Sequence, residues 1–348
     1  MVLDLLLQHL AGKTRQPWTA FHFVTPLVAH VAATSGATRP AHVRLVRTDC
    51  NKETIMPYAH AKDGTRLYYK DWGKGKPVVL LHGWPLTGDT FDDAALRLAE
   101  NGFRAIIPDR RGFGRSDQPW DGYDYDTFSD DVAAILTEAG ITEPVALVGF
   151  SMGGGEVARF LSRHGTQRVT KAVLISSVVP YMAQTDDNPD GVPQATFDEM
   201  TAGMKKDREH FFKGFFKDFY GVGALSSPVS EEVLMNSWRQ TMMAGLRPTL
   251  AAAKAFATTD FRPDLKSFTV PTLVIHGTAD KTVPIGATGR VVAKQVPGAQ
   301  IIEYDGSAHG LFAIDKERLI DDLLTFLKGD RAEQGADQRS AIPMTQQA

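Results

Sequence analysis

From Tyr58 onward, apolar and polar positions follow two rhythms that are typical of strands and helices. Short aliphatic runs predict buried strands, and longer stretches with apolar residues at helical spacing predict helices. The predicted strands lie at 59–61, 66–71, 78–81, 105–108, 144–148, 172–176, 272–276 and 300–304, and the helices between them at 90–101, 127–139, 156–162, 285–296 and 316–327. This alternation predicts an α/β fold in which helices cover both faces of a mostly parallel central sheet.

The strand rhythm stops between residues 179 and 269. Four helical patterns rich in Phe and Met take its place, at 194–204, 207–220, 230–244 and 250–257. They predict a helical cap, residues 179–269, inserted into a sheet core formed by 56–178 and 270–328. The aromatic residues are assigned to the core of the cap, and an apolar pocket between cap and sheet is the alternative.

The two ends of the chain lack these patterns. Prolines and glycines break residues 1–55 into short pieces without a period, which predicts a poorly ordered extension. The apolar stretch 21–33 raises the alternative of a secretory signal, but Pro26 and two histidines interrupt it. A translation start at Met56 is a second alternative. The polar tail, 329–348, is predicted to be disordered.

Basic and acidic residues nearly balance, because 38 Lys and Arg against 41 Asp and Glu leave a net charge of −3 over 348 residues. No general field therefore attracts nucleic acid or an anionic membrane, and small neutral or weakly polar substrates fit better. No apolar run approaches the roughly 18 residues of a membrane span. Cys50 is the single cysteine, which excludes an internal disulfide and favours a reducing compartment, the cytoplasm.

Two polar turns resemble ligand-binding loops but lack a required feature. Residues 73–76 do not have phosphate-loop spacing, and a strand rather than a helix follows them. Residues 186–191 match the opening of a calcium loop, yet Phe197 stands where a bidentate glutamate is needed. We therefore predict neither a phosphate loop nor a metal site.

One stretch carries a specific chemical signal. Residues 149–153, Gly-Phe-Ser-Met-Gly, lie between a buried strand and a helical pattern, the context of a nucleophile elbow. Gly149 and Gly153 fit this turn because it leaves no room for side chains on either side of Ser151. The backbone N–H of Met152, at the start of the helix, would point toward a developing oxyanion.

A serine hydroxyl needs a base, and the base needs an orienting carboxylate. Asp280 follows the strand 272–276 by a short turn, and His309 follows the last strand, so both would lie at the same sheet edge as Ser151. Other residues fit less well as carboxylate or base, namely Asp260, Asp264, Asp305, His164, His210 and His276.

The second oxyanion donor is expected in the loop after the strand 78–81. Trp84 N–H is the best candidate, with His82 and Gly83 shaping the loop. The Trp84 side chain is interpreted as a pocket wall, and a core aromatic is the alternative.

At these residues the sequence resembles a known family. From about Tyr58 to Lys328 it is similar to the α/β-hydrolase superfamily and, within it, to the bacterial cofactor-free (non-heme) haloperoxidase/arylesterase group of perhydrolases. The motifs that carry the resemblance are 82–86 (HGWPL), 109–116 (DRRGFGRS), 149–159 (GFSMGGGEVAR), 185–189 (TDDNP), Asp280 and 309–310 (HG).

The resemblance implies a catalytic triad of Ser151, Asp280 and His309, with oxyanion donors at Trp84 and Met152. It also implies hydrolysis of small carboxylic esters and, with hydrogen peroxide, perhydrolysis of a carboxylic acid to a peracid that oxidises halide without haem or metal. Pro85 looks like the peroxide-accepting version of the oxyanion loop, and Pro85 and Phe150 are assigned to the substrate pocket. Met152 and Ala308 depart from the residues common in the group.

Two other classes of function stay open at this point. One is a ligand receptor on the same fold that keeps the triad but does not turn over, and the other is a lyase that uses the same triad. Dehalogenase or epoxide hydrolase chemistry would need an aspartate at position 151. The sequence leaves open whether the chain forms a homo-oligomer.

Overall fold

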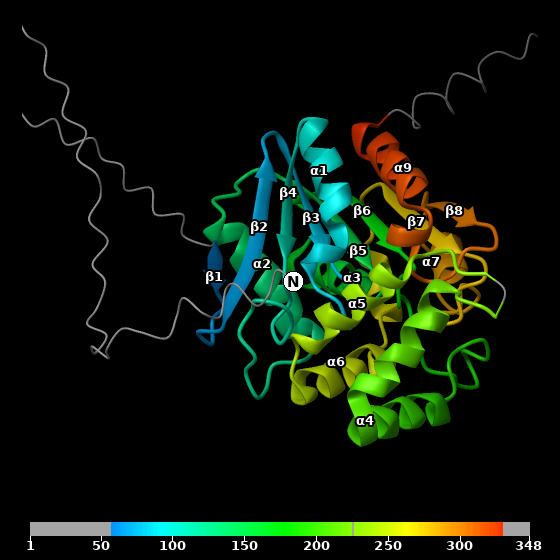
Figure 1. The fold of residues 1–348 in the computed structure, drawn as a ribbon. Helices are drawn as coiled ribbons and strands as arrows, with labels where there is room; N and C mark the ends of the chain where they lie inside the picture. Colours follow the sequence, from blue (N-terminus) through cyan, green and yellow to red (C-terminus); the bar gives the residue numbers. More distant parts are fainter. Residues whose placement is uncertain (1–56, 225, 330–348) are drawn as a thin grey trace, which may run out of the picture. The chain divides into compact units, whose positions relative to one another are not determined.

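A single sheet of eight strands organises the computed structural model, which describes residues 57–224 and 226–329 (Figure 1). The strands lie in the order β1-β2-β4-β3-β5-β6-β7-β8. β1 pairs with β2, and β2 pairs with β4, in an antiparallel way, whereas the remaining neighbours in this sheet are parallel. Their bounds are Tyr58–His60 (β1), Arg66–Gly73 (β2), Lys76–Leu81 (β3), Phe103–Pro108 (β4), Val145–Phe150 (β5), Val169–Ile175 (β6), Thr272–Gly277 (β7) and Gln300–Tyr304 (β8).

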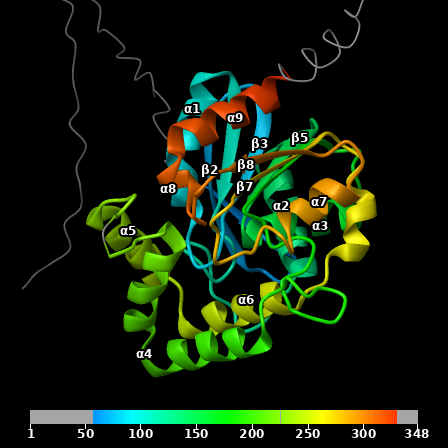
Figure 2. The ribbon, with the colours of Figure 1, turned by 90° about the vertical axis from the view of Figure 1, so that its right-hand side faces the viewer.

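Helices cover both faces of this sheet, which confirms the predicted fold class. Every residue of β5 and β7 is buried, as expected for central strands that are shielded on two sides. Figure 2 shows α1 and α9 on one side of the strands and α2, α3 and α7 on the other. These helices span Asp92–Glu100 (α1), Tyr125–Glu138 (α2), Met152–His164 (α3), Gly289–Gln295 (α7) and Lys316–Lys328 (α9).

The helical insertion between β6 and β7 consists of three helices. They are α4 (Gln194–Tyr220), α5 (Glu231–Met242) and α6 (Leu246–Thr258), and Figures 1 and 2 show them together beyond one end of the strands. The predicted break between the first two helical patterns is a kink at Asp207, whose φ of −160° and ψ of 88° interrupt α4.

Several boundaries differ from the sequence expectation. The predicted helix 285–296 begins only at Gly289, because residues after Pro284 form turns first. The predicted helix 90–101 divides into a 3₁₀ turn, η1 (Gly88–Phe91), and α1. Two short elements were not expected: η2 (Arg262–Ser267) and α8 (Leu311–Ile314). The proposed extension 1–55 and the tail after Gly329 lie outside the described residues.

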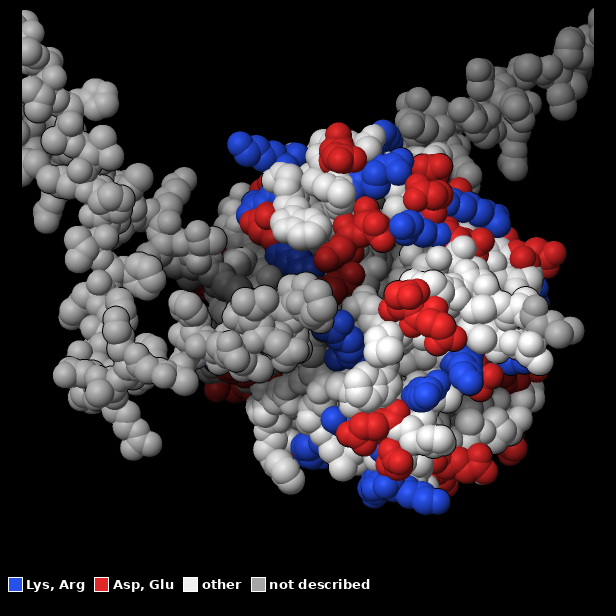
Figure 3. All heavy atoms as spheres, viewed as in Figure 1, with Lys and Arg blue, Asp and Glu red and all other residues white. Residues whose placement is uncertain are grey.

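Charge is mixed on the face of the molecule that Figure 3 shows. On the face in Figure 3, Lys and Arg are interspersed with Asp and Glu, in agreement with the net charge of −3. No helix within residues 57–224 and 226–329 is both long and apolar enough to cross a bilayer. Asp187, in the segment that resembles a calcium loop, pairs instead with Arg262 at 2.6 Å.

The turn that joins β1 to β2 contains a carboxylate with a lowered pKa. Asp63 accepts a hydrogen bond from the backbone N–H of Thr65 at 3.0 Å and pairs with buried Arg111 at 2.7 Å. Partial burial opposes ionisation, but the bonds from Arg111 and Thr65 prevail and lower the pKa of Asp63 to about 2. Since its usual value is 3.8, the ionised group stabilises the fold above about pH 4.

This linkage gives a prediction on acid stability. The stabilisation from Asp63 is lost as pH falls from about 4 through 2, so Asp63→Asn is expected to be less stable than the wild type near pH 6 and nearly equal to it near pH 2. Urea unfolding at a series of pH values measures the difference. A difference that stays constant from pH 6 to pH 2 would contradict the assignment.

Candidate active site

Ser151 occupies a sharp turn between β5 and α3. Its φ of 53° and ψ of −116° are unusual for a residue other than glycine and fit a strained nucleophile elbow. A Cβ at Gly149 would lie 2.4 Å from the carbonyl oxygen of Gly153, and one at Gly153 would lie 2.1 Å from that of Leu81. The backbone therefore requires glycine at both flanking positions, as the sequence predicted.

The two backbone N–H groups that the sequence suggested as oxyanion donors have no acceptor among the described residues. Within the described part of the chain, neither the N–H of Met152 nor that of Trp84 has a hydrogen-bond acceptor. Residues of the insertion hold the Trp84 indole. Its Nε1–H donates to the carbonyl of Thr249 at 3.0 Å, and its ring packs on Phe212 and Phe256. The side chain of Trp84 thus packs against the insertion, while its backbone N–H is without an acceptor in the described part of the chain.

Asp280 and His309 form a buried pair at the ends of β7 and β8. His309 Nδ1 lies 2.6 Å from Asp280 Oδ2, while Asp280 Oδ1 accepts the backbone N–H groups of Thr282 and Val283 at 2.9 and 2.8 Å. Burial works against the ionised carboxyl, but interactions with His309 and His276 outweigh it and hold the pKa of Asp280 well below its usual value. A permanently ionised Asp280 fixes the N–H of His309 on Nδ1.

The loop geometry brings these two residues together. A Cβ at Gly277 would lie 2.2 Å from the Ser307 carbonyl oxygen, so the end of β7 packs directly on the loop that carries His309. The backbone N–H of Ala279 donates to the same carbonyl at 3.0 Å. The rival carboxylate Asp264 instead pairs with Arg159.

The imidazole of His309 is enclosed by aromatic rings. Its ring centroid lies 5.0 Å from that of Phe150, the residue before Ser151, and 4.7 Å from that of Phe219 in α4. His309 Nε2 is buried and has no hydrogen-bond partner in residues 57–224 and 226–329. This nitrogen therefore makes no hydrogen bond to the Ser151 hydroxyl in the structure and is free to accept one.

Phe150 and Pro85 lie in places that differ from the expected pocket walls. Phe150 is 1% exposed and packs on His309, Phe219 and Phe312. Pro85 is buried and follows a cis peptide bond from Trp84. Phe150 thus packs against His309, and the residues that line the cavity at Ser151 come from other segments.

A cavity of about 500 Å³ opens at Ser151 and Trp84, between the sheet edge and the insertion. Its walls are largely aromatic and aliphatic, which suits an apolar acyl or aryl group. Lys281 and Asp218 add one charge of each sign. The other lining residues are Val178, Met182, Val192, Thr196, Phe197, Met200, Phe211, Gly214, Phe215, Phe256, Thr282 and Val283. The insertion therefore supplies both cap core and pocket wall, so both interpretations of its aromatic residues were right.

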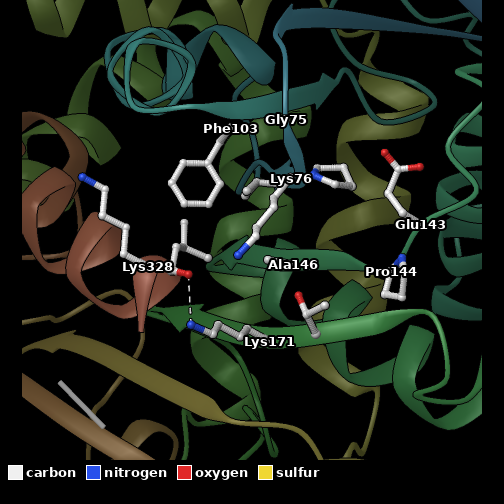
Figure 4. A pocket seen from close by; sticks show the side chains of 12 residues that line it. Gly75, Lys76, Phe103, Glu143, Pro144, Ala146, Lys171 and Lys328 are labelled. Atoms are coloured by element: carbon white, nitrogen blue, oxygen red, sulfur yellow. Dashed lines mark hydrogen bonds between the residues drawn. The ribbon is translucent and has the colours of Figure 1, made fainter. Parts of the chain in front are cut away.

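A larger cavity of about 770 Å³ lies away from the elbow (Figure 4). It is lined by residues at the beginnings of parallel strands, such as Lys76, Phe103 and Lys171, whereas ligands of open α/β sheets bind at the carboxyl ends. Two of its three lysine amines bind the fold itself, because Lys171 donates to carbonyls at the end of α9 and Lys328 donates to Asn101. This cavity is not the catalytic site.

A buried ion pair that the sequence did not reveal supports the oxyanion loop. Arg110 binds both oxygens of Glu156 at 2.6 and 2.7 Å, and its Nη2 donates to the carbonyl of His82 at 2.5 Å. The backbone N–H of Arg110 donates to His82 Nε2 at 3.0 Å. Burial and the Arg110 charge lower the pKa of His82 well below its usual value, so its ring stays neutral and can accept this bond.

Breaking this pair gives a prediction on stability. Glu156→Ala is expected to lower the free energy of unfolding by about 3–5 kcal/mol, because it leaves the Arg110 charge buried without its partner. Asp130→Ala, which breaks an exposed bidentate pair with Arg163, should cost less than about 1 kcal/mol. Urea denaturation of both variants measures the contrast, and equal losses would contradict it.

Known proteins are similar to this chain in sequence and in fold. The α/β hydrolase fold family matches residues 76–315. The chain is 44% identical to the non-heme chloroperoxidase CPO-A1 of Kitasatospora aureofaciens over 274 residues, 78% of this chain and 99% of the relative. It is 42% identical to the bifunctional esterase/perhydrolase DCH of Acinetobacter calcoaceticus over 276 residues, 78% of this chain and 100% of the relative.

A solved structure agrees. The crystal structure of a bromoperoxidase from Bacillus anthracis has 42% sequence identity and a TM-score of 0.75, and the match covers 78% of this chain and 100% of that one. Sequence, fold and elbow geometry lead to one family. The chain belongs to the α/β-hydrolase superfamily, as a hydrolase/perhydrolase of the non-heme chloroperoxidase group.

Proposed function

We propose that the protein is a serine esterase for small apolar carboxylic esters that also forms peracids from carboxylic acids and hydrogen peroxide. The observation that carries this proposal is the buried Asp280–His309 pair, at 2.6 Å, whose free Nε2 lies in the aromatic enclosure next to the Ser151 elbow. Peroxide and ester chemistry are also named for relatives at 42–44% identity.

The proposed mechanism follows the usual order of acyl transfer. The Ser151 hydroxyl attacks the ester carbonyl, His309 Nε2 takes its proton, and the N–H groups of Met152 and Trp84 bind the oxyanion. The alcohol leaves with the proton from His309; where the substrate is a carboxylic acid, water leaves in its place. Water then attacks the acyl-serine to give the acid, or hydrogen peroxide attacks it to give the peracid, and Ser151 regains its proton.

The parts of the chain divide these tasks in the proposal. The sheet core, 56–178 and 270–328, carries Ser151, Asp280 and His309, while the cap, 179–269, supplies most of the cavity wall. The 500 Å³ volume and the apolar lining support a preference for short acyl and aryl groups over long chains.

One set of assays tests the proposal. Purified protein is given p-nitrophenyl esters of two to sixteen carbons, and separately acetate, peroxide and bromide with a chlorinatable or brominatable dye. Steady turnover of short esters and acid-dependent bromination are expected. A burst of one equivalent of nitrophenol without turnover would favour the receptor alternative, and bromination that does not need a carboxylic acid would overturn the peracid route.

A further inference from the structure

A second histidine faces the same carboxylate as His309. His276, near the end of β7, is fully buried, and its Nε2 lies 3.3 Å from Asp280 Oδ2. The same nitrogen lies 3.0 Å from the carbonyl oxygen of Val283. A carbonyl only accepts, so Nε2 of His276 carries a hydrogen and donates toward both oxygens, the longer branch going to Asp280.

The other ring nitrogen fixes this arrangement. His276 Nδ1 is buried without a partner within the described residues, so a hydrogen there would have no acceptor. A Cβ at Gly289, the first residue of α7, would lie 2.8 Å from Nδ1. The backbone of α7 therefore packs closely on the Nδ1 edge of the ring, while Nε2 faces Asp280.

Asp280 consequently receives donors on both oxygens. Oδ1 accepts two backbone N–H groups, and Oδ2 is shared between His309 at 2.6 Å and His276 at 3.3 Å. A donor on Oδ2 from His276 withdraws charge that would otherwise stabilise the protonated His309, and it also prevents the carboxylate from rotating.

From this geometry we infer that His276 is a positioning residue that acts through Asp280, holding the carboxylate in line with His309 and limiting the basicity of that histidine. The inference rests on the proposed triad. His276 acts on no substrate directly in this inference: Thr282 and Val283 line the cavity at Ser151, and His276 is not among its lining residues.

Other charges near His276 are few. On the neighbouring strand β8, Glu303 is its register partner, and Glu303 is bound to Arg290 at 2.7 and 2.9 Å on the surface. Asp280, which also binds His309, faces His276 from the turn after β7.

The pH profile of kcat/KM tests the inference. His276→Leu removes the donor, so Asp280 stabilises protonated His309 more strongly and the acidic limb for p-nitrophenyl acetate hydrolysis is expected to move up by about one pH unit or less. The freed carboxylate should also lower kcat by about 10-fold. His276→Gln, whose amide places an N–H₂ near the position of Nε2, should restore the wild-type limb and most of kcat.

Two further variants test the inference without removing the His276 side chain. Gly289→Ala pushes on the ring without removing it and should shift the limb in the same direction by a smaller amount. Glu303→Gln removes the neighbouring exposed charge and should leave the limb in place, because exposed charges are screened.

The outcomes separate this inference from the proposed function. An unmoved acidic limb in His276→Leu, or a glutamine variant no better than the leucine variant, would overturn the role of His276 while leaving the triad intact. Loss of ester turnover in the wild type, or its survival in Ser151→Ala, would instead overturn the proposed function.

Discussion

Ser151→Ala is expected to lose ester hydrolysis by about 10⁴- to 10⁶-fold in kcat, because no acyl-enzyme can form without the hydroxyl. Peroxide-dependent bromination should fall by the same factor, since the proposed peracid arises from the same acyl-serine. Initial rates with p-nitrophenyl acetate, and with acetate, peroxide and bromide, measure both activities in one preparation.

The matched control for this variant is Ser162→Ala. Ser162 lies on the same helix, α3, but its hydroxyl bonds to Asp264 rather than facing the cavity. It should keep kcat within about twofold for both reactions, as surface substitutions away from a site usually do. Halogenation that survives in Ser151→Ala while hydrolysis disappears would show that the two reactions do not share the serine.

The fold and the Ser151 elbow could be predicted from local patterns, and Asp280 and His309 could be predicted from the order of the strands. Strand–helix alternation sets the parallel sheet, and glycines at 149 and 153 mark a turn that tolerates no side chain. Asp280 and His309 follow from topology, since loops after parallel strands meet at one edge. The order of the strands thus predicted that Asp280 and His309 lie close together, and they are 2.6 Å apart in the structure.

The missed residues depend on contacts between distant segments. Arg110 and Glu156 stand in motifs that were singled out for other reasons, and only the packing of α3 on the loop after β4 shows that they form one buried pair. His276 lies within the predicted strand 272–276 and was for that reason set aside as the base. Its neighbour Asp280 is four positions away, but the turn after β7 brings them to 3.3 Å, which no periodicity predicts.

The place of Phe150 has the same explanation. The sequence assigned it to the substrate pocket, but its ring packs on His309, and it is not among the residues that line the cavity at Ser151. The aromatic residues around Ser151 come from the insertion instead, where Phe197, Phe211 and Phe215 are far from the elbow in sequence.

Asp280→Asn is expected to lower kcat for ester hydrolysis by about 10⁴-fold with little change in KM. The asparagine amide can donate to His309 Nδ1, and this favours the tautomer with its hydrogen on Nε2, the nitrogen that must accept the serine proton. Because the wild-type pKa of Asp280 is well below its usual value, the carboxylate is ionised throughout the neutral range and the deficit should persist from pH 6 to pH 9.

Asp280→Asn is also expected to change the pH dependence of stability, and Asp305→Asn, in the loop before His309, is its matched control. Ionised Asp280 stabilises the fold above its unfolded pKa of about 4, and this contribution is lost as pH falls through the lower folded value, so Asp280→Asn should approach wild-type stability only in acid. Asp305→Asn, in the loop before His309, removes a carboxylate that accepts a hydrogen bond from the Thr278 hydroxyl at 3.1 Å and should keep kcat within about twofold. If Asp305→Asn were the inactive variant and Asp280→Asn active, Asp305 would be the carboxylate that orients His309, and the triad would have to be reassigned.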